Sequence, residues 1–450
     1  MMGDTICALA TSAGGAIGII RVSGQNAIAL TDIVFRPAGG KSLCKAEGYT
    51  IHYGEIIDKT SEVIDEVLVS VFRAPHSYTG EDSTEISCHG SRYILRQVLQ
   101  TLIDRGCRQA QPGEYTQRAY LNGKMDLSQA EAVADLIAAG NRATHRLALG
   151  QLKGHFSEEL ARLREQLLKM TSLLELELDF SDQDVNFADR HELLELALTI
   201  DRRIVSLAHS FEAGNALKKG VPVAIVGKTN VGKSTLLNRL LHEERAIVSD
   251  IHGTTRDVIE DTVDIRGITF RFIDTAGIRH TVDRIEQLGI ERTYRKLDEA
   301  TIILWLFDEP PTTEEYDQMK VRTTGKKLIK VFNKVDLPRV TPSLPQDILL
   351  LSAKQGDGVA QLEEALCQAA DIPEFNENDV VVTSARHYDA LTHAHDALVR
   401  VIDSLEQDVS GDLLSEDLRQ VLTYLANITG GVITTDEVLN SIFKNFCIGK

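Results

Sequence analysis

The chain has 450 residues with 43% hydrophobic content, which is too long for one hydrophobic core and predicts two to four domains. Its formal net charge of -18 argues against a protein that coats bare nucleic acid through a broad basic face, but leaves room for a local RNA site or a basic protein partner. The six cysteines are scattered without a Cys-x-x-Cys pair, so neither a disulfide framework nor a structural zinc site is expected.

The compartment is predicted from the same features. The N-terminus lacks the basic start of a secretion signal. The longest strongly apolar run, Ile302–Phe307, is far too short to cross a bilayer. Scattered cysteines suit a reducing environment, so we expect a soluble cytoplasmic protein without a membrane or DNA partner.

Residues 1–120 predict a small α+β domain. Runs rich in Val, Ile and Tyr at 50–57 and 63–72 indicate strands, and residues 91–104 indicate a helix. Gly14–Gly18 superficially resembles a dinucleotide-binding loop, but its spacing is not Gly-x-Gly-x-x-Gly. We interpret it as a turn that leads into a strand at Ile17–Val22.

Two helical stretches flank a central α/β unit. No proline occurs between Pro112 and Pro222 or after Pro373. Amphipathic patterns at 126–139, 156–178, 191–213, 385–407 and 413–429 predict helices in these proline-free stretches. The economical interpretation is one discontinuous all-α domain, residues 121–216 and 376–450, into which an α/β domain at 217–375 is inserted.

The inserted domain begins with a phosphate-binding signature. The apolar strand 221–226 leads into Gly227-Lys-Thr-Asn-Val-Gly-Lys-Ser234, and a helix at 235–241 follows. Backbone N–H groups of Asn230 to Ser234 would surround the β-phosphate at the helix N-terminus. Lys233 would reach the β/γ oxygens, and Ser234 would ligate Mg²⁺.

Four further motifs follow in a fixed order. Gly253–Asp257 contains Thr255, which we choose as the residue that senses Mg²⁺ and the γ-phosphate. In Asp274–Gly277, Asp274 would hold a Mg²⁺-bound water, and the Gly277 N–H would meet the γ-phosphate.

The last two motifs, Asn333–Asp336 and Ser352–Lys354, would bind the base. Asp336 can accept both N–H donors of guanine, a pairing that adenine does not offer. The five motifs together predict a Ras-like P-loop domain that binds and hydrolyses GTP. The candidate nucleotide-binding residues are Asn230, Val231, Gly232, Lys233, Ser234, Thr235, Ser249, Asp250, Ile251, His252, Gly253, Thr254, Thr255, Asp274, Thr275, Ala276, Gly277, Asn333, Lys334, Asp336, Ser352, Ala353 and Lys354.

One position departs from Ras-like enzymes. Ile278 stands where they carry the glutamine that orients the attacking water, so hydrolysis needs another water-orienting group and another positive charge. The amide oxygen of Asn230 could ligate a monovalent cation beside the phosphates. Glu286 could orient or deprotonate the water, although spacing alone favours a solvated helix residue.

Seven segments make the whole chain resemble the bacterial tRNA-modification GTPases of the MnmE/TrmE family, within the TrmE-Era-EngA-like P-loop GTPases. The segments that carry the resemblance are Arg21–Gly24, Tyr78–Asp82, Pro112–Leu127, Ala130–Ala132, Gly253–Asp257, Ile285–Arg292 and Cys447–Lys450. The terminal Cys-Ile-Gly-Lys behind a P-loop GTPase is highly specific for this family.

The resemblance implies cofactors and partners. It implies a homodimer held by the N-terminal domains, each of which binds 5-formyl- or 5,10-methylene-tetrahydrofolate through residues matching Arg21, Glu81, Lys124 and Lys450. It implies a flavoprotein partner that carries FAD, MnmG (GidA), and an aminomethyl or carboxymethylaminomethyl group installed at C5 of the wobble uridine of certain tRNAs. It also implies potassium-dependent G-domain dimerisation, a water-orienting Glu286, and a K⁺ shell of Asn230, Ser249, Ile251 and Thr254 beside Mg²⁺ on Ser234 and Thr255.

Several alternatives stay open. From sequence alone, each folate candidate could be a surface ion pair or a turn residue. Cys447 could take part in chemistry near the folate or be a small buried hydrophobe. The chain could also be a regulatory or ribosome-assembly GTPase, or a stand-alone folate enzyme with a fused GTPase switch.

Overall fold

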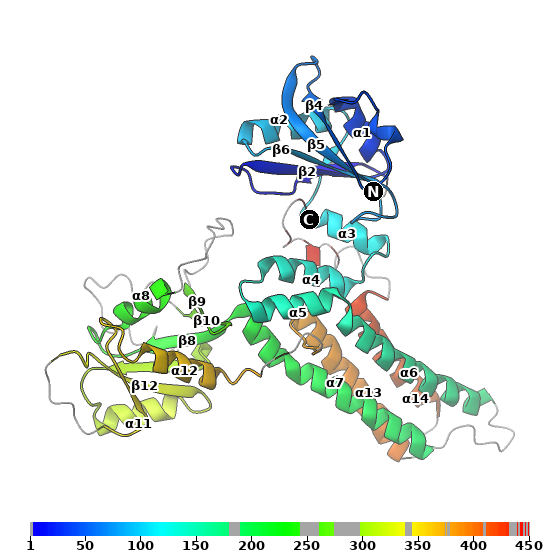
Figure 1. The fold of residues 1–450 in the computed structure, drawn as a ribbon. Helices are drawn as coiled ribbons and strands as arrows, with labels where there is room; N and C mark the ends of the chain where they lie inside the picture. Colours follow the sequence, from blue (N-terminus) through cyan, green and yellow to red (C-terminus); the bar gives the residue numbers. More distant parts are fainter. Residues whose placement is uncertain are drawn as a thin grey trace. The chain divides into compact units, whose positions relative to one another are not determined.

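The computed structural model describes residues 3–179, 190–243, 261–273, 298–337, 344–373, 375, 379–407 and 411–431, together with residues 439, 442, 443, 446 and 449. The chain divides into two compact units (Figure 1). The first comprises Met1–Ala138, Gln151–Ile200 and His393–Lys450, and the second comprises Ala139–Gly150 and Asp201–Thr392. Each is described by itself.

The first unit contains a seven-stranded sheet in the order β3-β4-β5-β6-β2-β1-β7. All neighbouring strands are antiparallel except β1 and β7. The helices α1 (Ala27–Val34) and α2 (Arg92–Asp104) pack their apolar residues onto strand residues in one shared core. The strands are β1 (Ile6–Leu9), β2 (Ile17–Ser23), β3 (Phe35–Pro37), β4 (Thr50–Ile57), β5 (Val63–Phe72), β6 (Ser83–His89) and β7 (Arg108–Gln109).

Helices from both ends of the chain complete the first unit. Helix α6 (His155–Asp179) packs against α14 (Gly411–Thr429), although more than 200 residues separate them in sequence. Arg400 on α13 (Ala385–Glu406) donates to Asp417 on α14 at 2.8 Å. The short helices α3 (Glu114–Leu121) and α4 (Leu127–Ala138) and the first residues of α7 (Arg190–Lys219) belong to this unit too. The predicted discontinuous helical domain is therefore confirmed.

The second unit contains a six-stranded sheet in the order β13-β12-β11-β8-β10-β9. All pairs are parallel except the β9–β10 hairpin. Its strands are β8 (Val221–Val226), β9 (Asp261–Ile265), β10 (Ile268–Phe272), β11 (Ile302–Phe307), β12 (Lys327–Asn333) and β13 (Ile348–Leu351).

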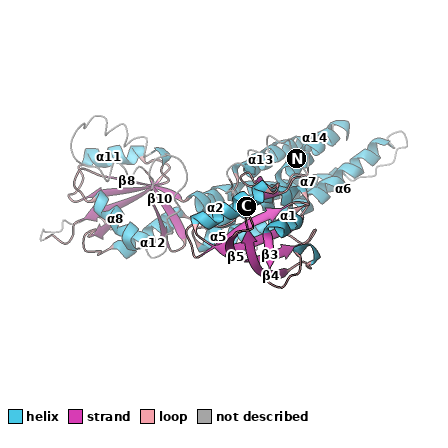
Figure 2. Cartoon of the chain, turned by 90° about the horizontal axis from the view of Figure 1, so that it is seen from above, coloured by secondary structure: helices cyan, strands magenta, loops and turns pink. Residues whose placement is uncertain are grey.

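Helices cover both faces of this sheet, as parallel strands without alternating polarity require. Figure 2 shows α8 (Lys233–Glu243) and α12 (Val359–Ala370) on one side and α11 (Thr313–Arg322) on the other. Leu236 of α8 and Leu362 of α12 share one core with the sheet, and Tyr316 of α11 packs in the other. The predicted fold class, an α+β domain, a split helical domain and an inserted P-loop α/β domain, is thus confirmed, whereas the exact boundaries at residues 120, 216 and 375 stay predictions.

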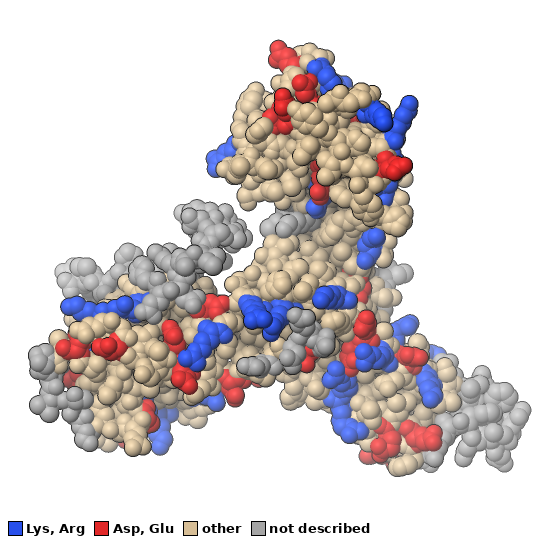
Figure 3. All heavy atoms as spheres, in the orientation of Figure 1, with Lys and Arg blue, Asp and Glu red and all other residues tan. Residues whose placement is uncertain are grey.

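Charged side chains are spread over the surfaces of both units (Figure 3). Among the described residues, no helix is long and apolar enough to span a membrane.

Candidate nucleotide-binding site and N-terminal site

The loop after β8 has the backbone of a phosphate-binding loop. Gly227, Asn230 and Gly232 have positive φ values of 153°, 63° and 99°, a region that side chains disfavour. A Cβ atom on Gly227 would lie 2.2 Å from the carbonyl oxygen of Leu306 on β11, so only glycine fits there. The loop runs directly into α8 at Lys233, and the N–H groups and dipole of a helix N-terminus favour an anion.

The side chain of Lys233 folds back over this loop. Its ammonium donates to the carbonyl oxygens of Gly227 at 2.6 Å and Lys228 at 2.7 Å. These contacts hold a positive charge against the loop backbone. The arrangement can bind a phosphate through a mobile point charge and fixed backbone donors together.

Asn333, at the end of β12, joins the loop after β8 to the segment after β13. Its amide nitrogen donates to Val231 O at 2.7 Å, and its amide oxygen accepts from Ala353 N at 3.0 Å. The side chain is only 2% exposed. A Cβ atom on Gly232 would lie 2.3 Å from the Asn333 amide nitrogen, so the glycine also makes room for this link.

Asp336 and Ser352, the residues predicted to bind the base, are in direct contact. The Ser352 hydroxyl donates to Asp336 Oδ1 at 2.8 Å and accepts from Gln355 N at 3.1 Å. A carboxylate has about four lone-pair sites, so Asp336 keeps the capacity to accept two more N–H donors. Ser352 is fully buried, which fixes the orientation of the carboxylate.

Two lysines beside the site are paired with carboxylates. Lys334, at a φ of 66°, lies 2.7 Å from Asp308 Oδ2. Lys228 of the phosphate loop lies 2.7 Å from Glu315 on α11, and this contact lowers the pKa of the Glu315 carboxyl. Arg239 of α8 donates to the carbonyl oxygen of Lys354.

Asp308, Glu315 and Arg239 lie outside the sequence motifs. Asp308 could have been identified as a site residue from the sequence, because it directly follows the buried strand β11. Carboxyl ends of parallel strands are where ligands of such sheets bind.

The structure brings Asn230 to Thr235, Asn333, Lys334, Asp336 and Ser352 to Lys354 close together, and their roles in nucleotide binding stay predictions. The remaining candidates lie outside the described residues. They are Ser249, Asp250, Ile251, His252, Gly253, Thr254, Thr255, Asp274, Thr275, Ala276, Gly277 and Glu286.

The predicted folate residues of the N-terminal domain meet around the loop Tyr78–Glu81. The Arg21 guanidinium lies 5.5 Å from the ring centre of Tyr78 and 5.6 Å from that of Tyr115. The pKa of Tyr78 is raised, mainly by burial. Lys124 packs against Gly80 and donates to Pro75 O at 3.0 Å.

Glu81 is held by two donors. The Ser23 hydroxyl donates to its carboxylate at 2.9 Å, and Arg118 does so at 3.2 Å. The Arg118 side chain is 10% exposed and also pairs with Asp4 at 2.6 Å and Glu114 at 3.0 Å. Burial alone would raise the pKa of the Glu114 carboxyl, but hydrogen bonds from Arg108, Gln111 N and Arg118 lower it overall. Arg118 lies within the segment Pro112–Leu127 that resembles the family. Its contact with Asp4, however, spans 114 residues, and the spacing of a motif does not reveal a contact of that length.

Gly449, the described residue of the C-terminal tail, lies beside this site within the first unit. Arg21 donates to Gly449 O at 3.5 Å. A Cβ atom on Gly449 would lie 2.1 Å from Leu9 O, and Phe443 and Phe446 pack against Gly113. Cys447 and Lys450 themselves lie outside the described residues.

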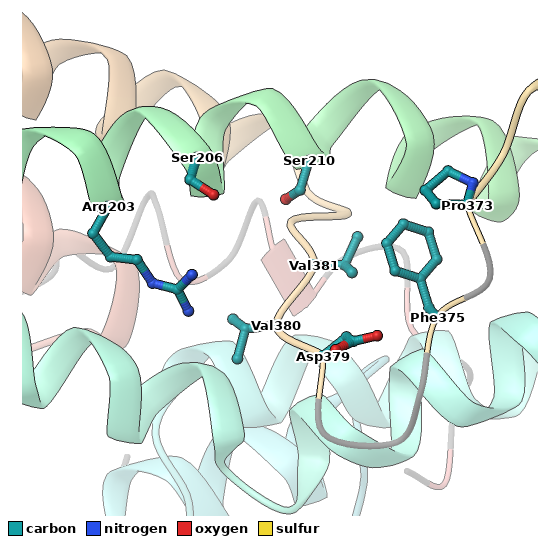
Figure 4. A pocket seen from close by; sticks show the side chains of 8 residues that line it. All are labelled: Arg203, Ser206, Ser210, Pro373, Phe375, Asp379, Val380 and Val381. Carbon is teal, nitrogen blue, oxygen red and sulfur yellow. The ribbon is translucent and has the colours of Figure 1, made fainter.

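Beyond the two sites above, we searched the described part of the chain for metal-binding clusters and cavities. No cluster of three or more His, Cys, Asp or Glu residues suited to a metal ion occurs there. A cavity of about 350 Å³ lies in the second unit between α7 and the segment around Pro373–Val381 (Figure 4). Its lining contains none of the predicted site residues, so it is separate from the nucleotide motifs.

Two family models match the chain. One, described as the MnmE helical domain, matches residues 127–447, and the other, the GTP-binding protein TrmE N-terminus, matches residues 5–124. Curated proteins named tRNA modification GTPase MnmE from Bacteroides fragilis, Phocaeicola vulgatus and Flavobacterium johnsoniae are 58%, 55% and 49% identical, each over 99% of both chains. A crystal structure of the T. maritima FeoB iron transporter G domain is 22% identical over 34% of this chain and 99% of that one, with a TM-score of 0.24, too low to bear on the fold.

Proposed function

Because this chain belongs to the MnmE family of tRNA modification GTPases, we propose the following activity for it. It is a potassium-activated GTPase that acts with the FAD protein MnmG in the cytoplasm. Together they install an aminomethyl or carboxymethylaminomethyl group at C5 of the wobble uridine of certain tRNAs. The one-carbon unit comes from a tetrahydrofolate derivative.

The observation that carries the GTPase assignment is the double hydrogen bond of Asn333. It connects Val231 in the phosphate loop with Ala353 beside the base-recognition residues. Phosphate and base contacts are thereby fixed relative to each other, so one nucleotide can bridge both. Within that frame Lys233 binds the β/γ oxygens, and Asp336 accepts from the guanine edge.

The metal roles rest on the loop conformation. Ser234, the second residue of α8, is proposed to ligate Mg²⁺ together with Thr255. Asn230 has the left-handed conformation at the tip of the loop, and its amide oxygen is proposed as a K⁺ ligand with Ser249, Ile251 and Thr254. A potassium ion there would supply the positive charge that an arginine finger gives elsewhere, while Glu286 orients the water in place of the glutamine replaced by Ile278.

The folate role rests on the donor set around Tyr78–Glu81. Arg21 and Lys124 supply cations that suit the carboxylates of a folate. Glu81 supplies acceptors that suit pterin N–H groups, and Ser23 and Arg118 hold it in place. Folate, when bound, supplies the one-carbon unit, with Lys450 as a further proposed ligand.

The homodimer is supported by an exposed apolar sheet face. Ile51 is 67% exposed, Tyr53 54% and Leu68 47%. Tyr53 stands opposite Leu68 in the β4–β5 register, and Ile51 shares the face of Tyr53 because side chains alternate along a strand. Apolar patches of this kind mark interaction surfaces, and we propose that a second copy covers this one.

Folate binding distinguishes this function from a regulatory or ribosome-assembly GTPase. Calorimetric titration of the full chain with 5-formyl-tetrahydrofolate should show binding, and Glu81→Gln should weaken it at least 10-fold, since hydrogen bonds to charged groups contribute about 1.5–3 kcal/mol. Glu62→Gln, at an exposed position of the β4–β5 turn, is the matched control and should bind normally. A wild-type chain that does not bind folate would contradict the folate role and favour the regulatory GTPase.

A further inference from the structure

Three segments of the second unit meet at Thr269 of β10. The Asn141 amide nitrogen donates to the Thr269 hydroxyl at 2.8 Å. The Asn141 amide oxygen also accepts from Thr144 N at 2.8 Å, and this contact caps the start of α5 (Arg142–Leu152). From the other side, a Cβ atom on Gly220 would lie 3.2 Å from Thr269 O, so the end of α7 packs against the same residue. The N-terminus of α5, the C-terminus of α7 and β10 are therefore neighbours.

Each of these segments lacks acidic residues, although the chain as a whole has a net charge of -18. No Asp or Glu occurs at 136–157, at 213–242 or at 265–273. Asp264 stands opposite Thr269 in the hairpin, and its carboxylate accepts from Gly267 N inside the turn at 2.9 Å. These three stretches of sequence therefore carry a net positive charge in an otherwise acidic protein.

The positive groups are accessible. Arg142 and Lys219 are exposed, and each is adjacent in sequence to a residue that contacts Thr269. Arg146 follows Arg142 by one helical turn and therefore shares its face of α5. In Figure 3, Lys and Arg side chains gather over α5 and the end of α7. We call Arg142, Arg146 and Lys219 the basic junction.

We propose that the basic junction binds the phosphate backbone of tRNA. Arginine and lysine are the groups that neutralise RNA phosphates, and the family acts on tRNA. The proposal therefore rests on the proposed function and adds the surface through which this chain holds its RNA. The junction is anchored on β10, whose hairpin lies in the sequence between the predicted motifs Gly253–Asp257 and Asp274–Gly277. Bound RNA would therefore contact the nucleotide-binding domain directly.

The test measures the affinity of the full chain for an unmodified tRNA transcript with a wobble uridine, by fluorescence anisotropy at several KCl concentrations. The variant Arg142→Ala/Arg146→Ala/Lys219→Ala should bind roughly 10-fold or more weakly at 0.1 M salt. The slope of log affinity against log salt should become shallower by roughly 2, since each phosphate contact contributes about 0.7–0.9. The control Lys41→Ala/Lys45→Ala/Lys59→Ala removes the same charge from exposed positions of the first unit and should bind within about 2-fold of wild type.

The outcomes separate the surface from the function. Equal losses in both triple variants would overturn the basic junction, because they would reflect net charge alone. Normal tRNA affinity in the junction variant would also overturn the proposal. If that variant bound tRNA normally but no longer supported tRNA modification, the basic junction would instead bind an acidic protein partner. A wild-type chain that binds no tRNA would contradict the proposed function as well. Thermal unfolding of each variant checks that the chain remains folded, and Arg142→Lys/Arg146→Lys should retain most of the affinity because it keeps the charge.

Discussion

The substitution Asn333→Ala should have two effects: it should destabilise the nucleotide-binding domain, and it should weaken nucleotide binding. The substitution removes both hydrogen bonds of a side chain that is 2% exposed. The Val231 carbonyl and the Ala353 N–H would then lack these partners in residues that are themselves 2% and 3% exposed. A buried polar group without its partner costs about 1–3 kcal/mol, so the free energy of unfolding of this domain should fall by about 2–6 kcal/mol.

Unfolding of the nucleotide-binding domain can be followed by the fluorescence of a natural tryptophan. Its single tryptophan, Trp305, lies in β11 and is 6% exposed. Urea unfolding followed by Trp305 fluorescence therefore reports on the nucleotide-binding domain. Calorimetric titration with GDP completes the assay and should show weaker binding.

A matched control is Asn238→Ala, which removes an exposed asparagine from α8. Its unfolding free energy should stay within about 0.5 kcal/mol of wild type. If Asn333→Ala left both the Trp305 transition and GDP affinity at wild-type values, Asn333 would not link the phosphate loop to the base-binding segments.

Three further predictions concern the nucleotide. Asp336→Asn should lose GTP affinity and gain relative preference for xanthosine triphosphate, measured by competition binding; unchanged GTP affinity would end the assignment. Replacing K⁺ by Na⁺ should slow GTP hydrolysis sharply, with Asn230→Ala weakening that response, because the smaller ion fits the same oxygen shell poorly; equal phosphate release in both salts would refute the cation role. Glu286→Ala should bind GTP nearly normally yet hydrolyse it roughly 10²-fold more slowly in single-turnover assays; a normal rate would return Glu286 to a solvated helix residue.

Local signals predicted most of the fold. The strands at 50–57 and 63–72 match β4 and β5, because alternating β-branched runs between turns define such strands without distant partners. The helix expected at 385–407 matches α13 to within one residue, since amphipathic periodicity is also local. The phosphate loop was predictable because glycines at Gly227 and Gly232 meet a steric demand that spacing reveals.

Long-range contacts could not be predicted in the same way. The hydrogen bond from Asn333 to Val231 spans 102 residues, and that from Arg118 to Asp4 spans 114. Asn333 was found only because its motif marks it, but its partners Val231 and Ala353 follow β8 and β13, strands whose order in the sheet no local pattern reveals. The basic junction was even less predictable from the sequence. No motif marks any of its three segments, and they become neighbours only through their contacts with Thr269.

The most direct measurement of the proposed function is nucleoside analysis of tRNA from a strain that lacks its own MnmE and carries this chain. Wild-type protein should restore the C5-substituted wobble uridine, detected by liquid chromatography and mass spectrometry. Lys233→Ala should not restore it, because the variant loses the ammonium that lies over the phosphate loop. An unmodified wobble uridine despite expressed wild-type protein, or full modification with Lys233→Ala, would contradict the proposal that this chain modifies tRNA through GTP turnover.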